Sequence, residues 1–277
     1  QAGPKTARVM RPADHGMPAS DHAAVPVRDR VTVFTSAILL LIAAAAWISV
    51  VVSSRRGDDM MMTMPMPVTV ADGLAFVVSW AVMMTAMMLP SALPMIALYG
   101  AIQRRAAGAG TTGVPVAVFT LVYLGLWAAT GAPVYVAHAL LMTLAGPAFA
   151  YGIAVILLAA GVFQLSPLKQ VCLRACRSPL GFLLGHWRAG LRGSLALGWS
   201  HAVYCLGCCW ALMLVLVVAG AMGLVWVLLI AALVAAEKLL PGGEWIARAA
   251  GGALVLLGVA VAVRPDLVMA LRGGHTM

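Results

Sequence analysis

The fold class is decided by VTVFTSAILLLIAAAAWISVVV, residues 31–52, a run without a single charged side chain. An α-helix needs about 20 predominantly apolar residues to cross the hydrocarbon core of a bilayer. The whole chain of 277 residues is 63% hydrophobic and 10% charged, whereas a soluble domain carries roughly 25% charged residues. We therefore predict an integral membrane protein, which excludes soluble enzymes, nucleic-acid-binding modules and disordered chains.

Six further stretches meet or approach the length of a membrane span. They cover residues 73–98, 115–141, 148–166, 194–219, 222–240 and 245–263. With the first run they predict an all-α polytopic bundle of about seven transmembrane helices, or six if one stretch is re-entrant. Pro133 lies inside the third stretch, so we expect that helix to be kinked or to end early.

The composition predicts a transmembrane domain over residues 31–266 between two polar tails, 1–30 and 267–277. Residues 53–72 form a methionine-rich outer loop in this scheme. Residues 167–193 mix apolar side chains with five cations and no acids, which is typical of an amphipathic helix on the anionic inner surface of a bilayer.

The net charge of +9 follows from membrane topology. With the N-terminus inside and the C-terminus outside, 14 of the 18 basic residues lie on the cytoplasmic side, as the positive-inside rule requires. We therefore expect the lipid bilayer, and no nucleic acid, as a partner. No GxxxxGK[ST] phosphate loop is present, which argues against an ATP-driven pump.

Methionines gather in two clusters, one in the outer loop and one in the second span. Those of the loop RRGDDMMMTMPMP are Met60, Met61, Met62, Met64 and Met66; those of the span motif MMTAMM are Met83, Met84, Met87 and Met88. Thioethers are soft ligands that select copper(I). Methionine is also an adaptable filler of helix contacts, so packing remains the alternative, particularly for the span cluster.

The fifth span, GWSHAVYCLGCCWALML, gathers one imidazole and three thiols on one helical face. At 100° per residue they fall within an arc of about 100°; they are His201, Cys205, Cys208 and Cys209. This donor set suits copper(I) or zinc(II). Ordinary packing of small buried cysteines is the alternative.

Two more thiols, Cys172 and Cys176, stand four residues apart in KQVCLRACR of the basic segment. The surrounding cations should lower their pKa and favour the metal-binding thiolate. Two small residues on the apolar face of an interfacial helix would give the same spacing. Glu237 and Lys238 end the sixth stretch, where we expect anchors, or partners of the basic segment, rather than ligands.

Four ordered motifs in the chain, MMTAMMLPSALPM, FQLSPLKQVCLRACRSPL, HAVYCLGCCWALML and AAEKLLPGGE, carry a resemblance. Over roughly residues 75–262 the chain resembles a bacterial family of predicted metal-binding integral membrane proteins, built around a domain of unknown function. The resemblance implies a protein of the bacterial inner membrane, and some members of the family are thought to supply copper to copper-dependent oxidases. It also implies metal ligation by the span methionines, by His201 and by all five cysteines.

The sequence thus predicts a membrane protein that binds copper(I), or alternatively zinc(II). It would transport copper or deliver it to a copper-dependent enzyme or a periplasmic copper carrier. A membrane thiol–disulfide oxidoreductase that uses Cys205 and Cys208 is one alternative. The other is a non-catalytic accessory subunit of a membrane copper enzyme.

Overall fold

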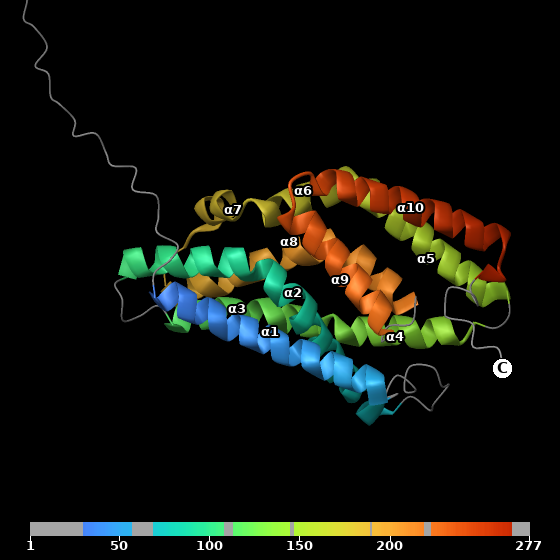
Figure 1. Cartoon of the computed structure of the whole chain (residues 1–277), viewed down its shortest axis with the longest axis horizontal. Coiled ribbons are helices and arrows are strands. Elements are labelled where there is room, and N and C mark those ends of the chain that lie inside the picture. The colour runs from blue at the N-terminus through green and yellow to red at the C-terminus, as the bar shows by residue number, and fades with distance from the viewer. Residues whose placement is uncertain are drawn as a thin grey trace, which may run out of the picture.

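The structure, a computed structural model, describes residues 30–56, 69–107, 113–144, 147–188, 190–218 and 223–267. These residues form a helix bundle (Figure 1), which confirms the predicted all-α class. In chain order the helices are α1 (Arg30–Arg56), α2 (Val70–Ala107), α3 (Gly113–Ala129), α4 (Gly131–Met142), α5 (Pro147–Leu165), α6 (Pro167–Arg177), α7 (Pro179–His186), α8 (Gly190–Val218), α9 (Leu224–Leu239) and α10 (Gly243–Val263).

Six segments of the described chain are long and apolar enough to cross a membrane. They belong to α1, α2, α3 with α4, α5, α8 and α10. The predicted sixth span appears as α9, which has 16 residues and so extends about 24 Å at 1.5 Å per residue. That is short of a hydrocarbon core about 30 Å thick, so a count of seven spans stays a prediction.

The third span is interrupted where Pro133 indicated. Helix α3 ends at Ala129 and α4 begins at Gly131, because the proline ring clashes with the carbonyl group four residues earlier. The Trp80 indole of α2 donates to the Thr130 hydroxyl at 3.0 Å, which holds the interruption against α2.

Two prolines lie within α2, the longest helix. Pro90 and Pro94 both follow the MMTAMM motif. Because neither has an N–H group, the carbonyl groups of Ala86 and Pro90 have no backbone donor at the usual helical spacing. The helix therefore continues through a stretch with an incomplete hydrogen-bond ladder.

The helices pack in pairs around α8. In Figure 1, α1 lies beside α2, and α5 lies along α10 at the other end of the molecule. The second pair is tight: a Cβ atom added at Gly161 would meet Val255 Cγ2 at 2.7 Å. Helix α8 packs against α3, α5, α6 and α9, and its buried residues run from Gly193 to Val218.

The predicted amphipathic segment contains α6 and α7. Ser166 caps α6 by accepting a hydrogen bond from the Lys169 N–H at 3.2 Å, and Pro167 follows at the first helical position, where proline is favoured. One face of α6 is buried against α8 and carries Lys169, Cys172 and Leu173. The amphipathic pattern of α6 thus reflects contact with the bundle, and contact of the segment with lipid stays a prediction.

Candidate metal centre

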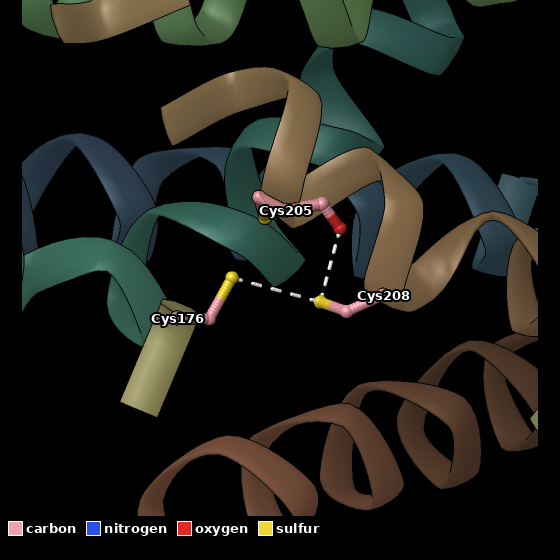
Figure 2. Close-up of side chains that lie close together, drawn as sticks. All are labelled: Cys176, Cys205 and Cys208. Carbon is pink, nitrogen blue, oxygen red and sulfur yellow. Dashed lines mark hydrogen bonds between the residues drawn. The ribbon is translucent and has the colours of Figure 1, made fainter. Parts of the chain in front are cut away.

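Three cysteine thiols meet between α6 and α8. The sulfur atoms of Cys176, Cys205 and Cys208 all lie within 4.8 Å of one another, and Figure 2 shows Cys176 pointing from α6 toward the two residues of α8. The Cys176 and Cys208 sulfurs are 3.7 Å apart. We call these residues the three-thiol cluster. A geometry of this kind can hold one soft metal ion.

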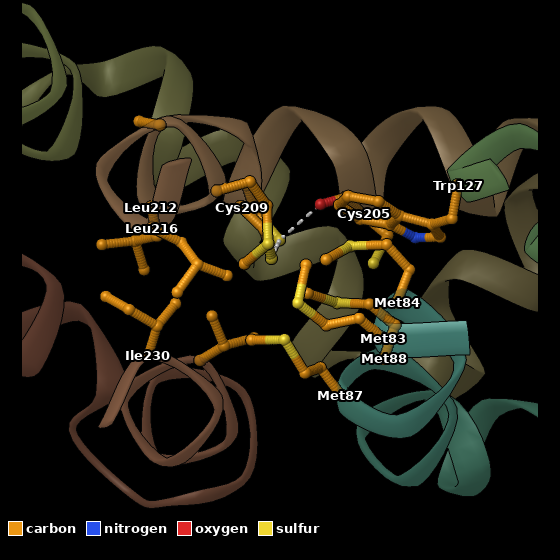
Figure 3. Close-up of a cluster of buried hydrophobic side chains, with 14 of the residues drawn as sticks. Met83, Met84, Met87, Met88, Trp127, Cys205, Cys209, Leu212, Leu216 and Ile230 are labelled. Atoms are coloured by element: carbon orange, nitrogen blue, oxygen red, sulfur yellow. Dashed lines mark hydrogen bonds between the residues drawn. The ribbon is translucent and has the colours of Figure 1, made fainter. Parts of the chain in front are cut away.

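Cys209 adjoins the three-thiol cluster on its apolar side. Its sulfur lies 3.2 Å from that of Cys208, and the side chain is 1% exposed. In Figure 3 it lies among the apolar side chains of Leu212, Leu216 and Ile230. Cys209 therefore extends the sulfur-lined region toward the hydrophobic core.

Cys172 points elsewhere than Cys176. Its sulfur contacts α8 at Gly207, where an added Cβ atom would lie 2.8 Å away. The prediction that nearby cations lower the pKa of this thiol is wrong, because burial raises the pKa of Cys172 and the charge of Lys169 opposes that effect only in part. Lys169 forms an ion pair with the Glu237 carboxylate.

Glu237 is the predicted partner of the basic segment, and the structure confirms this role. Its carboxylate accepts from Lys169 Nζ at 2.6 Å and from Gln164 Nε2 at 2.8 Å. Lys169 Nζ also donates to the main-chain oxygen of Cys208. The side chains of Lys169 and Glu237 are 0% and 1% exposed, so this network joins α5, α6, α8 and α9 inside the protein.

Lys238 is buried beside the sulfur atoms, whereas the sequence indicated an anchor or a partner of the basic segment. Its ammonium nitrogen lies 3.1 Å from Cys205 Sγ, 3.3 Å from Ser91 Oγ and 3.8 Å from Met88 Sδ. Long basic side chains at the end of a span usually extend toward water. Lys238 instead turns inward, because α9 packs against α2 and α8, and it faces the three-thiol cluster.

Two aromatic rings complete this region. The Tyr123 hydroxyl lies 3.1 Å from Cys205 Sγ, and the Tyr123 ring stacks on the His201 imidazole with centroids 5.3 Å apart. His201 is 3% exposed, and neither of its ring nitrogens has a hydrogen-bond partner in the described chain. Buried polar groups are normally hydrogen-bonded, so the imidazole is available to a ligand.

The four span methionines lie against the cysteines of α8. Met83, Met84, Met87 and Met88 are each at most 4% exposed, and Figure 3 shows them extending from α2 toward Cys205, Cys209 and Trp127. The structure therefore brings the sulfur-bearing segments of the second and fifth spans together. The loop methionines, Met60, Met61, Met62, Met64 and Met66, lie outside the described residues.

A cavity of about 230 Å³ reaches the cluster. Cys176, Cys205 and His201 line it, together with Tyr123 and Lys238. The remaining lining comes mainly from α2 and from the junction of α6 with α7. Two of the three clustered thiols, those of Cys176 and Cys205, therefore border a pocket.

Comparison with known families agrees with this chemistry. A family model described as a copper chaperone matches residues 77–261. The chain belongs to this PpoB2 copper chaperone family. No curated protein and no solved structure matches the chain.

The part matched by the copper chaperone family includes the three-thiol cluster, Cys172, Cys209, His201 and the four span methionines. The outer-loop methionines precede it. Membership of the copper chaperone family and the cluster of thiols support a copper-related role. Sequence reasoning missed Tyr123 and assigned Lys238 a different role, because their positions beside Cys205 depend on contacts between helices.

Proposed function

We propose that this protein carries copper(I) within the membrane, and that it transports the ion or delivers it to a copper-dependent enzyme or periplasmic copper carrier. The observation that supports this most is the convergence of three thiols within 4.8 Å, inside a chain of a copper chaperone family. Thiolates and thioethers are the ligands that copper(I) prefers. Zinc(II) also accepts thiolates, so the experiment below measures both metals.

The proposal gives each sulfur group a different task. The loop methionines collect the ion outside, and the span methionines with His201 and Cys209 surround the holding site. Cys176, Cys205 and Cys208 hold the ion, and Cys176 exchanges it because it lines the cavity and comes from a separate helix. Copper(I) binds thiolate more firmly than thioether, so transfer runs from methionine to cysteine without an energy source.

The proposed orientation has the N-terminus in the cytoplasm and the C-terminus outside the inner membrane. It rests on the distribution of basic residues along the sequence. The cavity includes Arg177 of the basic segment, and we propose that it opens toward the cytoplasmic side.

One observation favours a second function. Cys205 lies 3.1 Å from the ammonium of Lys238, and a neighbouring cation favours the nucleophilic thiolate. A thiol–disulfide oxidoreductase that pairs Cys205 with Cys208, and passes electrons to a membrane quinone, would use the same contact. An oxidoreductase function does not explain why methionines surround the thiols.

The test is elemental analysis of copper and zinc in the purified protein after loading under reducing conditions. The wild type should bind copper, whereas a Cys205→Ser/Cys208→Ser/Cys209→Ser variant should lose most of it. Cys176→Ser should weaken retention, and Cys172→Ser on the same helix is the matched control with unchanged copper. Equal copper in the wild type and the triple variant would defeat the proposal and favour an accessory subunit. A Cys205–Cys208 disulfide detected by mass spectrometry, without bound copper, would favour the oxidoreductase.

A further inference from the structure

The cavity beside the three-thiol cluster carries positive charge and hydrogen-bond donors where a cation pathway would carry acids. Its polar lining comprises Ser91, Tyr123, Arg177, His201 and Lys238. Among the described residues that line it, none is an aspartate or glutamate. A bare metal cation would meet electrostatic repulsion at this approach.

Lys238 and Arg177 are the two cationic side chains among the described lining residues, and Lys238 is the more deeply buried. Within the described chain its side chain contacts two sulfur atoms and one hydroxyl, and it forms no ion pair with a carboxylate. The neighbouring acid, Glu237, binds Lys169 and Gln164 on another side of α9. A buried charge requires a partner of opposite sign. While Cys205 carries its proton, Lys238 has no anionic partner in the described chain, so an anion that enters the cavity supplies that interaction.

Two further groups face the same space. Arg177 lines the cavity and is half-buried, and its Nη1 donates to the Glu237 main-chain oxygen at 2.8 Å. His201 offers two ring nitrogens that have no partner in the described chain, and it is 97% removed from solvent. The cavity is therefore lined both by cationic groups and by two soft-metal ligands, Cys176 and Cys205.

We propose that copper(I) enters this cavity as an anionic complex with small-molecule thiolates and not as a free cation. This inference rests on the proposed copper(I) function and specifies the form of its cargo. Lys238 and Arg177 attract the negatively charged complex and hold its thiolate ligands while the ion reaches the cysteines. A volume of about 230 Å³ is too small to admit a folded carrier domain.

The transfer is a ligand exchange without a redox step. Two bonds between copper and the sulfurs of the small thiol break, and two bonds to cysteine sulfurs of the three-thiol cluster form. Each departing thiolate takes up a proton from the cysteine that replaces it and leaves as a neutral thiol. Copper remains copper(I), and the copper ion with its two thiolate sulfurs carries the same charge before and after the exchange.

The experiment compares loading rates from three copper(I) sources. The detergent-purified full chain receives copper(I) as the anionic glutathione complex, as the cationic acetonitrile complex, or bound to a peptide with two cysteines. Lys238→Gln removes the buried charge, Lys238→Arg restores it, and Arg174→Gln is the control because Arg174 is exposed on α6, outside the cavity lining.

We expect the wild type to load faster from the glutathione complex than from the acetonitrile complex. Lys238→Gln should slow loading from glutathione at least tenfold and leave loading from acetonitrile unchanged or faster, whereas Lys238→Arg and Arg174→Gln should resemble the wild type. Equal slowing from both sources would overturn the inference, as would a wild type that prefers the cation. Loading from the peptide alone would assign the thiolate to a carrier protein and also overturn it.

The failure of the proposed function looks different, because the wild type would then take copper from none of the three sources. Arg177→Gln provides a second variant if Lys238→Gln does not fold. It should slow loading from the glutathione complex alone, and slowing from both sources would count against the inference.

Discussion

The Lys169 ammonium lies 2.6 Å from the Glu237 carboxylate, and the same ammonium donates to the main-chain oxygen of Cys208. Lys169 thereby ties α6, which carries Cys176, to α8 and α9. Removing one partner from a buried ion pair leaves an uncompensated charge in a medium of low dielectric constant. The relative position of the thiols should therefore depend on this pair.

Lys169→Met is expected to destabilise the fold by about 3–5 kcal/mol, because it leaves the Glu237 carboxylate buried without a cation. Adding Glu237→Gln should recover more than half of the loss, since glutamine still accepts from Gln164. Reversible unfolding by SDS in mixed micelles measures both free energies. A double variant as unstable as the sum of its single variants would show that the pair is not coupled.

The contact of α5 with α10 predicts a strong effect at Gly161. A methyl group there would meet Val255 Cγ2 at 2.7 Å and the Gly251 carbonyl oxygen at 2.8 Å, so Gly161→Ala should cost about 1–3 kcal/mol through overpacking. Gly252→Ala on α10 is the matched control, because an added Cβ there meets nothing within 4 Å.

Gly252→Ala should leave stability unchanged or raise it by up to about 1 kcal/mol, given the higher helix propensity of alanine. The unfolding temperatures of the two variants in one detergent make the comparison. Equal effects of the two substitutions would contradict the packing described for α5 and α10.

The interruption between α3 and α4 depends on the Thr130 hydroxyl. It accepts from Trp80 Nε1 at 3.0 Å and donates to the Trp127 carbonyl at 2.6 Å. Thr130→Val leaves the indole N–H without its acceptor, which should cost about 1–3 kcal/mol. Thr143→Val is the control: the Thr143 hydroxyl is exposed and donates only to Leu140, so a change within about 0.5 kcal/mol is expected. SDS unfolding measures both, and a Thr130→Val variant as stable as the control would contradict the prediction.

Substitution of Met88 tests whether the span methionines ligate copper(I) or only pack. Its sulfur lies 3.8 Å from Lys238 Nζ, beside the three-thiol cluster, so Met88→Leu should weaken copper(I) retention against a competing chelator by about tenfold, or about 1.4 kcal/mol. Met213→Leu on α8 is the control, because Met213 is also buried, at 2% exposure.

Both substitutions conserve volume, and each should cost less than about 1.5 kcal/mol of stability. A titration with a chromophoric copper(I) chelator measures retention. If Met88→Leu and Met213→Leu retain copper equally well, the methionine of α2 packs and does not ligate.

Hydropathy predicted the helical bundle and most of its spans because each span is a local property of about 20 residues. Helical projection also placed Cys205 and Cys208 on one face of α8, and the structure has them in one cluster. It could not show which helices meet that face. Cys172 and Cys176 share one side of α6 by their spacing, yet Cys172 contacts Gly207 while Cys176 reaches Cys208.

Lys238 illustrates the same limit more sharply. A lysine near the end of an apolar stretch is typical of an anchor that extends toward water, and the sequence indicated only this role or that of a partner of the basic segment. Its inward position depends on α2, α8 and α9 meeting around Cys205, and α2 is separated from the other two by the five helices α3 to α7. Inter-helix contacts of this kind are a property of the assembled bundle.

Pro90 and Pro94 weaken the hydrogen bonding of α2 at the cavity, where the copper ion would pass. Ser91 and Pro94 line the cavity, and the carbonyl groups of Ala86 and Pro90 lack backbone donors at the helical spacing. Local opening requires few bonds to break in such a stretch, so amide hydrogens near Ser91 should exchange with deuterium sooner than those in the middle of α8. Bending of α2 at its two prolines would therefore widen the opening of the cavity while the other helices keep their positions.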